Sequence, residues 1–212
     1  MKAPEAIFPT SYFPPIAMAA AMLKQASKSG ELTIEQYETF PKQTHRNRTV
    51  IATANGPMVL SVPVIKNRGN HTQTKEIYIC YNERWNILQW RAIETSYNSS
   101  PFFLYYRDEV EKILLKKQET LLQLNEEILI FLFKKMKCNV EIKYTEEYLY
   151  PCDDTIDYRD YYSYKHPENL PEIASYPQVF SDRIPFNGNM GILDLLFNIG
   201  PETKDYLSLI KV

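Results

Sequence analysis

The spacing of apolar residues changes near residue 84, and this change limits the folds open to the chain. Before it, short segments that alternate apolar and polar residues are separated by Gly, Pro and Asn, which is typical of strands and turns. From 84 to 136, apolar residues recur at helical spacing, and residues 102–150 contain neither Gly nor Pro. Strands followed by long helices favour the α/β class.

We predict a mixed β-sheet that contains a β-hairpin and is covered by a cluster of helices. The hairpin joins residues 48–53 to 58–65 through the turn Asn55-Gly56-Pro57. The other strands are expected near residues 5–9, 31–37, 75–81 and 139–145. Helices are expected over residues 15–27, 84–97, 101–116, 120–136 and 191–199, and the pattern leaves open whether the third and fourth are joined near Lys117.

The composition changes after Tyr150. Residues 151–178 are rich in Tyr and Asp, poor in aliphatic residues and interrupted by prolines. We expect residues 1–150 to form an α/β body, and residues 151–212 to add an irregular segment and a short buried helix that pack back on it as one domain overall. The Tyr and Asp residues of 153–164 suit stacking and hydrogen bonding to a sugar, and a partner interface or an ordered arm is the alternative.

Charge and cysteine usage exclude several classes of protein. The 24 Lys and Arg against 26 Asp and Glu give a net charge of −2, so we expect no nucleic-acid partner. Three cysteines without a CxxC spacing, and three histidines without a ligand spacing, predict no metal site and no disulfide framework. No apolar run reaches the length of about 18 residues that a membrane span needs. We expect a cytoplasmic protein, whose cofactors and oligomeric state the sequence leaves unknown.

The sharpest polar cluster is the basic segment 42–49. If it is extended, Lys42, Arg46 and Arg48 lie on one face together with Thr44. Two arginines at this spacing can grip one anion with forked N–H donors, as a phosphate or carboxylate requires. A solvated strand face paired with acidic neighbours is the alternative.

A second candidate is the loop 10–15, between the first expected strand and the first expected helix. Loops at the carboxyl ends of strands line ligand sites in α/β folds, which makes Thr10 and Tyr12 candidates for substrate binding. The loop contains no glycine, so it is not one of the known phosphate-binding motifs. A structural proline turn is the alternative.

A third candidate is Asp194, which interrupts an apolar helix. A carboxylate in such a helix needs a partner, because burying an unpaired charge is costly. We expect the partner to come from the basic cluster, from Arg46 or Arg48, with Arg183 as another possibility. A buried carboxylate of this kind is either a catalytic base or part of a structural ion pair.

Five segments together resemble the WbqC-like protein family from Phe8 to Glu202. They are PTSYFPPI, KQTHRNRTVI, NGPMVLSVPV, Trp85 with the following IETSYNSSPFFLYY, and NMGILDLLFNIGPE. Members are associated with loci for O-antigen and other surface polysaccharides, and some are labelled glycine transferases. The chain departs from the pattern at Phe8, where many members have Gln, and at Gln89, where many have His.

The resemblance implies a transferase that places an acyl or aminoacyl group on an amino sugar, with a small anionic substrate such as a nucleotide sugar. On this interpretation Asn47 polarises a carbonyl and Asp194 orients or deprotonates the amine. The residues expected to bind substrate are Lys42, Arg46, Arg48, Tyr12, Thr10, Trp85 and Arg91. The alternative is a non-catalytic module that binds an anionic small ligand or a partner enzyme.

Overall fold

The centre of the protein is a parallel four-stranded sheet with the strand order β7-β2-β1-β8. The structure is a computed structural model that describes residues 4–150, 152, 154–163 and 166–212, so Asp153 and Tyr164 of the predicted sugar-binding segment lie outside the described residues. The strands are β1 (Ala6–Pro9), β2 (Glu31–Glu35), β7 (Glu141–Tyr144) and β8 (Ile156–Asp157).

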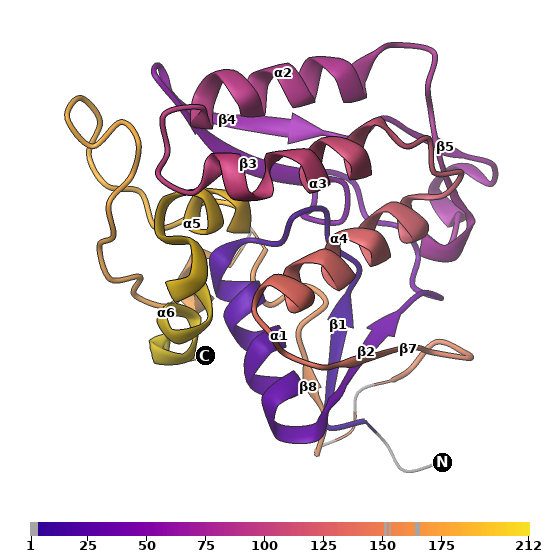
Figure 1. Cartoon of the computed structure of the whole chain (residues 1–212). Helices are drawn as coiled ribbons and strands as arrows, with labels where there is room; N and C mark the ends of the chain where they lie inside the picture. Colours follow the sequence, from indigo (N-terminus) through magenta and orange to yellow (C-terminus); the bar gives the residue numbers. More distant parts are fainter. Residues whose placement is uncertain (1–3, 151, 153, 164–165) are drawn as a thin grey trace.

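The chain opens with the expected βαβ unit. Helix α1 (Ile16–Ser29) begins after Pro15. Proline suits a helix start because it has no backbone N–H that would be left without a partner there. The helix ends at Gly30, whose φ of 75° is easily reached only by glycine and whose N–H is donated to the carbonyl of Ala26. Figure 1 shows α1 alongside the sheet. The helix returns the chain so that β2 runs parallel to β1.

The predicted hairpin is confirmed, but it does not join the main sheet. Among the residues that the structure describes, strand β3 (Arg48–Thr53) pairs only with β4 (Gly56–Ser61), and β5 (Val64–Lys66) pairs with β6 (Ile77–Ile79) in a second small sheet. The α/β class with a hairpin and covering helices is confirmed, but in the described part of the chain the strands form three sheets instead of the one mixed sheet expected. The hairpin strands instead pair with each other across the turn at Gly56, and β7 and β8 form the edges of the parallel sheet.

The expected helices are confirmed as separate elements. Figure 1 shows α2 (Trp85–Tyr97), α3 (Phe103–Leu115) and α4 (Leu121–Lys135) stacked beside one another. The break after α3 arises because Thr120 and Gln123 form a capping box that starts α4. Near the C-terminus, α5 (Ile192–Ile199) is buried and is followed by α6 (Thr203–Leu209), which packs on α1.

The two faces of the sheet differ. Phe8, Leu32 and Ile34 point into the hydrophobic core together with the helices. The strand register places Ile7, Thr33, Lys143 and Asp157 side by side on the other face. That second face is rich in polar side chains, and it leads to the site described below.

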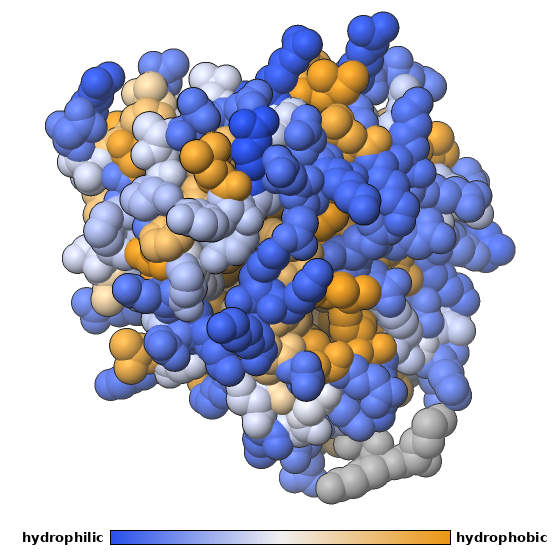
Figure 2. Space-filling model, in the orientation of Figure 1, coloured by the Kyte–Doolittle hydropathy of each residue, from blue (hydrophilic) through white to orange (hydrophobic). Residues whose placement is uncertain are grey.

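No helix in the described part of the chain is long and apolar enough to cross a membrane. The face shown in Figure 2 is mostly hydrophilic, and its apolar side chains form separate clusters rather than one continuous surface.

Candidate functional site

The carboxyl ends of the parallel strands meet beside a cavity of about 580 Å³. Strand β2 ends at Glu35 and β8 ends at Asp157, and ligands of open parallel sheets bind at this edge. We call this cavity the carboxyl-edge pocket. It is lined by Tyr37, Glu38, Thr39, Pro41, Arg46, Tyr148, Asp157, Arg159 and Asp160.

Arg46 is held in this pocket by a two-point contact with Glu38. Nε and Nη2 of Arg46 donate hydrogen bonds of 2.6 Å to the two carboxylate oxygens of Glu38, and Nη2 also donates to the carbonyl of Arg159. Burial raises the pKa of the Glu38 carboxyl, although the neighbouring Arg46 opposes this shift. Among the described residues no hydrogen bond of Nη1 of Arg46 is found, and Arg46 lines the pocket although its side chain is only 4% exposed.

Arg159 is held in the same way by Asp157. Nε donates to Oδ1 at 2.9 Å and Nη2 donates to Oδ2 at 2.7 Å, while the guanidinium lies 4.8 Å from the ring centre of Tyr148. Burial alone would raise the pKa of the Asp157 carboxyl, but the hydrogen bonds from Arg159 lower it. Asp157 is therefore the weaker base of the two lining carboxylates paired with arginine.

Behind the pocket, Glu35 is fully buried and joins three parts of the fold. Its carboxylate accepts hydrogen bonds from the Tyr37 N–H, the Thr145 hydroxyl, the Leu149 N–H and Nη1 of Arg159. A carboxyl group held by this many donors is fixed in position, and it orients Arg159.

The charge balance of the pocket favours a neutral or cationic ligand. Two arginines face the carboxylates of Glu38, Asp157 and Asp160, so the lining carries an excess of negative charge. The pocket matches a molecule with many hydroxyl groups. Its carboxylates accept hydrogen bonds, an arginine N–H donates one, and the rings of Tyr37 and Tyr148 offer flat faces.

The rest of the basic cluster does not form the extended face that its spacing suggested. Residues 42–47 form bends and a turn, Gln43 has a φ of 59°, and the strand begins only at Arg48. Lys42 is exposed, while the amide of Asn47 is buried and donates to the carbonyl of Val62. The expectation that Lys42, Arg46 and Arg48 share one face is therefore wrong, because Arg46 turns inward to Glu38.

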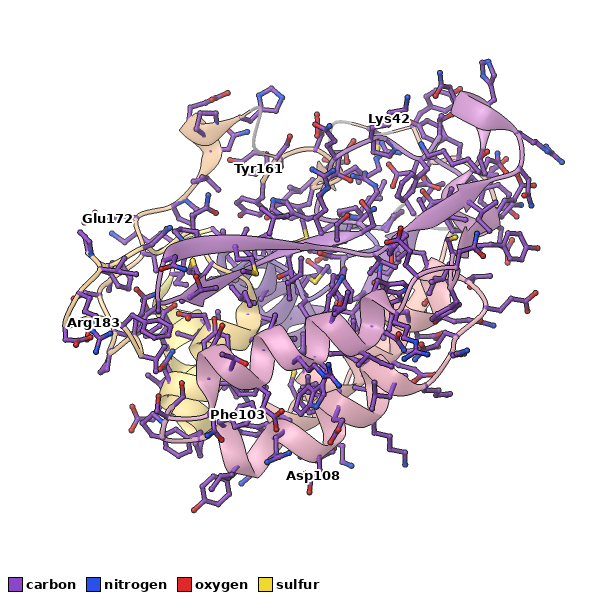
Figure 3. The ribbon with its side chains drawn as sticks, turned by 90° about the horizontal axis from the view of Figure 1, so that it is seen from above. Lys42, Phe103, Asp108, Tyr161, Glu172 and Arg183 are labelled. Atoms are coloured by element: carbon purple, nitrogen blue, oxygen red, sulfur yellow. The ribbon has the colours of Figure 1, made fainter. Side chains whose placement is uncertain are left out.

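Among the described residues, Asp194 forms no hydrogen bond or ion pair with the basic cluster, which corrects the expected ion pair. Its carboxylate accepts hydrogen bonds from the hydroxyls of Tyr97 and Tyr176 and from the amide of Gln178, at 2.8, 2.6 and 2.8 Å. Burial raises the pKa of this carboxyl, and the three donors oppose the shift. Arg183 pairs instead with Asp182, and Figure 3 shows it on an outer loop well away from Lys42.

The remaining predicted residues are dispersed. Thr10 accepts a hydrogen bond from Asn125, whose amide also donates to the Arg46 carbonyl, so Thr10 lies behind the pocket. The hydroxyl of Tyr12 donates to Gln89 in the interior. Trp85 is buried against Tyr81, and Arg91 is exposed on α2. The roles predicted for these residues in binding stay predictions.

The sequence reasoning missed Glu35, Glu38 and Arg159. One signal was available, because Glu35 lies within the predicted strand 31–37, near its carboxyl end. No local pattern indicates Arg159, since it meets Glu35 only through the pairing of β8 with β1.

Comparison with known proteins gives two findings. The model of the WbqC-like protein family matches residues 11–166, a range that contains every residue lining the carboxyl-edge pocket and excludes Asp194. The chain is also 25% identical over 196 residues to the uncharacterized protein Rv1507c of Mycobacterium tuberculosis (strain ATCC 25618 / H37Rv), with 79% of this chain and 83% of that protein covered. No solved structure gives a significant match.

Proposed function

Because the chain belongs to the WbqC-like protein family, we propose that it is a transferase of surface-polysaccharide assembly, which places an acyl or aminoacyl group on an amino sugar bound in the carboxyl-edge pocket. The observation that carries the proposal is the lining of this pocket. Two arginines, each held by a carboxylate, lie beside tyrosine rings at the carboxyl edge of a parallel sheet.

The pocket suits one sugar ring. Its volume of about 580 Å³ lies within the usual range for small-ligand sites, which is about 300–1,000 Å³. Nη1 of Arg46 donates to sugar hydroxyls, and the carboxylate of Asp160 accepts from them or pairs with an ammonium group. The ring of Tyr148 offers a flat apolar face to the C–H groups of the sugar.

The transfer step needs a base. The neutral amine of the sugar attacks the acyl carbon, the bond from that carbon to the donor's leaving group breaks, and the proton of the amine passes to a carboxylate. Glu38 is the candidate acceptor for this proton, since burial raises its pKa and so strengthens it as a base.

A nucleotide-linked donor approaches from the side of Lys42 in this proposal. Lys42 follows Pro41, which lines the pocket, and its charge contributes with burial to lowering the pKa of Lys66. In this proposal the ammonium groups of Lys42 and Lys66, which influence one another, attract the phosphates of such a donor. Arg48 keeps its predicted role of holding a phosphate or carboxylate, and Asn47 keeps its predicted role of polarising the carbonyl.

The proposal is tested by measuring both binding and turnover. Glucosamine, galactosamine and glucose are titrated into the protein by calorimetry, and the protein is then incubated with each amino sugar and a set of aminoacyl and acyl donors, with products read by mass spectrometry. We expect the amino sugars to bind more tightly than glucose and one donor class to give an N-acylated product. Glu38→Gln should abolish this product, whereas Asp108→Asn, on the exposed surface of α3, should leave it unchanged.

A non-catalytic binding module is the second candidate. Asn47 and Asp194, which were predicted to carry the chemistry, are both buried and hydrogen-bonded within the protein. Saturable binding of an amino sugar without product from any donor favours this second function.

A further inference from the structure

A second and larger cavity lies on the polar face of the sheet. This groove has a volume of about 1170 Å³, and Ile7 of β1 and Thr33 of β2 are among the residues that line it. Its size exceeds the range of about 300–1,000 Å³ that is usual for a small-ligand site. The proposed transfer to a single sugar makes no use of it.

A short segment divides the groove from the carboxyl-edge pocket. Residues 145–150, which we call the strap, are held down where Thr145 and Leu149 donate hydrogen bonds to Glu35. The Gln36 amide donates to the Thr145 carbonyl at 2.7 Å and fixes the same end of the strap. The strap is therefore anchored to the network that orients Arg159.

The strap presents one tyrosine to each cavity. Tyr148 lines the carboxyl-edge pocket and Tyr150 lines the groove, and their ring centres lie 4.9 Å apart in an edge-to-face contact. Near β8, Thr155, which directly precedes the strand, lines the groove, and Asp157, at the end of the strand, lines the pocket. The two cavities are thus neighbours on the same surface of the sheet.

The charges around the groove restrict what it binds. The groove is lined by four glutamates and one lysine, which are Glu5, Glu31, Glu146, Glu147 and Lys143. Lys143 is already paired with Glu31 at 2.5 Å. This acidic lining repels phosphates, so a nucleotide or coenzyme donor is disfavoured. The other polar groups are hydroxyls and amides, which exchange hydrogen bonds with sugar hydroxyls.

We propose that the groove is a second saccharide subsite, which holds the sugars that adjoin the amino sugar in an oligosaccharide acceptor. This inference rests on the proposed function for the identity of the first sugar. Tyr150 is 83% exposed and supplies the stacking surface of the subsite, as Tyr148 does in the pocket. The acceptor it selects is neutral or carries amino groups, in keeping with the acidic lining.

The test compares glucosamine with its β-linked tetramer by calorimetry. We expect the tetramer to bind the wild-type chain more tightly than glucosamine. Tyr150→Ala should weaken tetramer binding about two- to tenfold, the effect of one lost aromatic contact, and should leave glucosamine binding unchanged. Tyr105→Ala removes a similarly exposed tyrosine of α3, outside the lining of both cavities, and should change neither affinity.

Three results would overturn the inference. They are equal affinity for the monomer and the tetramer, an unchanged tetramer affinity in Tyr150→Ala, and binding of an oligolysine peptide in the groove without binding of the tetramer. Failure of the proposed function looks different. In that case glucosamine does not bind, while the tetramer still binds in a manner that depends on Tyr150.

Discussion

The guanidinium of Arg46 meets the carboxylate of Glu38 through two hydrogen bonds of 2.6 Å, and both side chains are buried. Removing one partner of a buried ion pair leaves the other charge uncompensated, which lowers the free energy of unfolding by about 3–5 kcal/mol. We therefore predict that Arg46→Met and Glu38→Leu each destabilise the chain by this amount, as measured by urea unfolding. The double variant should recover most of the loss, because it leaves neither charge behind. Single variants as stable as the wild type would show that the pair is solvated.

Asp194 is predicted to matter for stability and not for ligand binding. Its carboxylate links α5 to Tyr97 of α2 and to Tyr176 and Gln178, and it is not exposed to solvent. Asp194→Asn weakens this set of hydrogen bonds, so we expect a loss of about 1–3 kcal/mol in unfolding free energy. Calorimetry should find the same affinity for glucosamine as in the wild type. A large loss of affinity in a folded variant would return Asp194 to the binding site.

The same residue gives a prediction for pH. Burial raises the pKa of Asp194 in the folded chain above its ordinary value. A raised pKa in an acid favours the protonated folded form, so this contribution to stability is complete below the ordinary pKa and is lost as pH rises through the folded pKa. The stability of the wild type relative to Asp194→Asn should therefore fall as pH rises, in urea unfolding series run at each pH. A difference that grows with pH contradicts the assignment.

Gly191 has no room for a side chain. A Cβ at this position would lie 2.2 Å from the Thr49 hydroxyl and 2.9 Å from the Val50 carbonyl. Overpacking of this kind costs about 1–3 kcal/mol, so Gly191→Ala should lower the melting temperature. Adding Thr49→Ala should restore only part of the lost melting temperature, because the Val50 carbonyl remains in place. Full stability in Gly191→Ala would mean that α5 can move away from β3.

Local patterns predicted most of the elements but not their assembly. Helices and the hairpin depend on residues that are close together in the sequence, such as apolar residues at helical spacing or the capping pair Thr120 and Gln123. Such elements can therefore be predicted from local patterns. The order β7-β2-β1-β8 was not, because β8 has two residues and is defined by pairing with a strand about 150 residues earlier in the chain.

The candidate site shows the same limit. The sequence singled out Arg46, but its partner Glu38 lies in a different segment and carries no motif. An extended segment was assumed for residues 42–48, and the turn with positive φ at Gln43 instead directs Arg46 inward. The prediction that the buried carboxylate of Asp194 has partners is confirmed. The partners are two tyrosine hydroxyls and an amide in place of the expected cation.

The most direct test of the central claim is a crystal structure of the protein soaked with glucosamine. We predict ordered density for one sugar in the carboxyl-edge pocket, with Nη1 of Arg46 and the carboxylate of Asp160 within hydrogen-bond distance and a ring face against Tyr148. An empty pocket at a saturating concentration, or a sugar ordered only elsewhere on the chain, would contradict it.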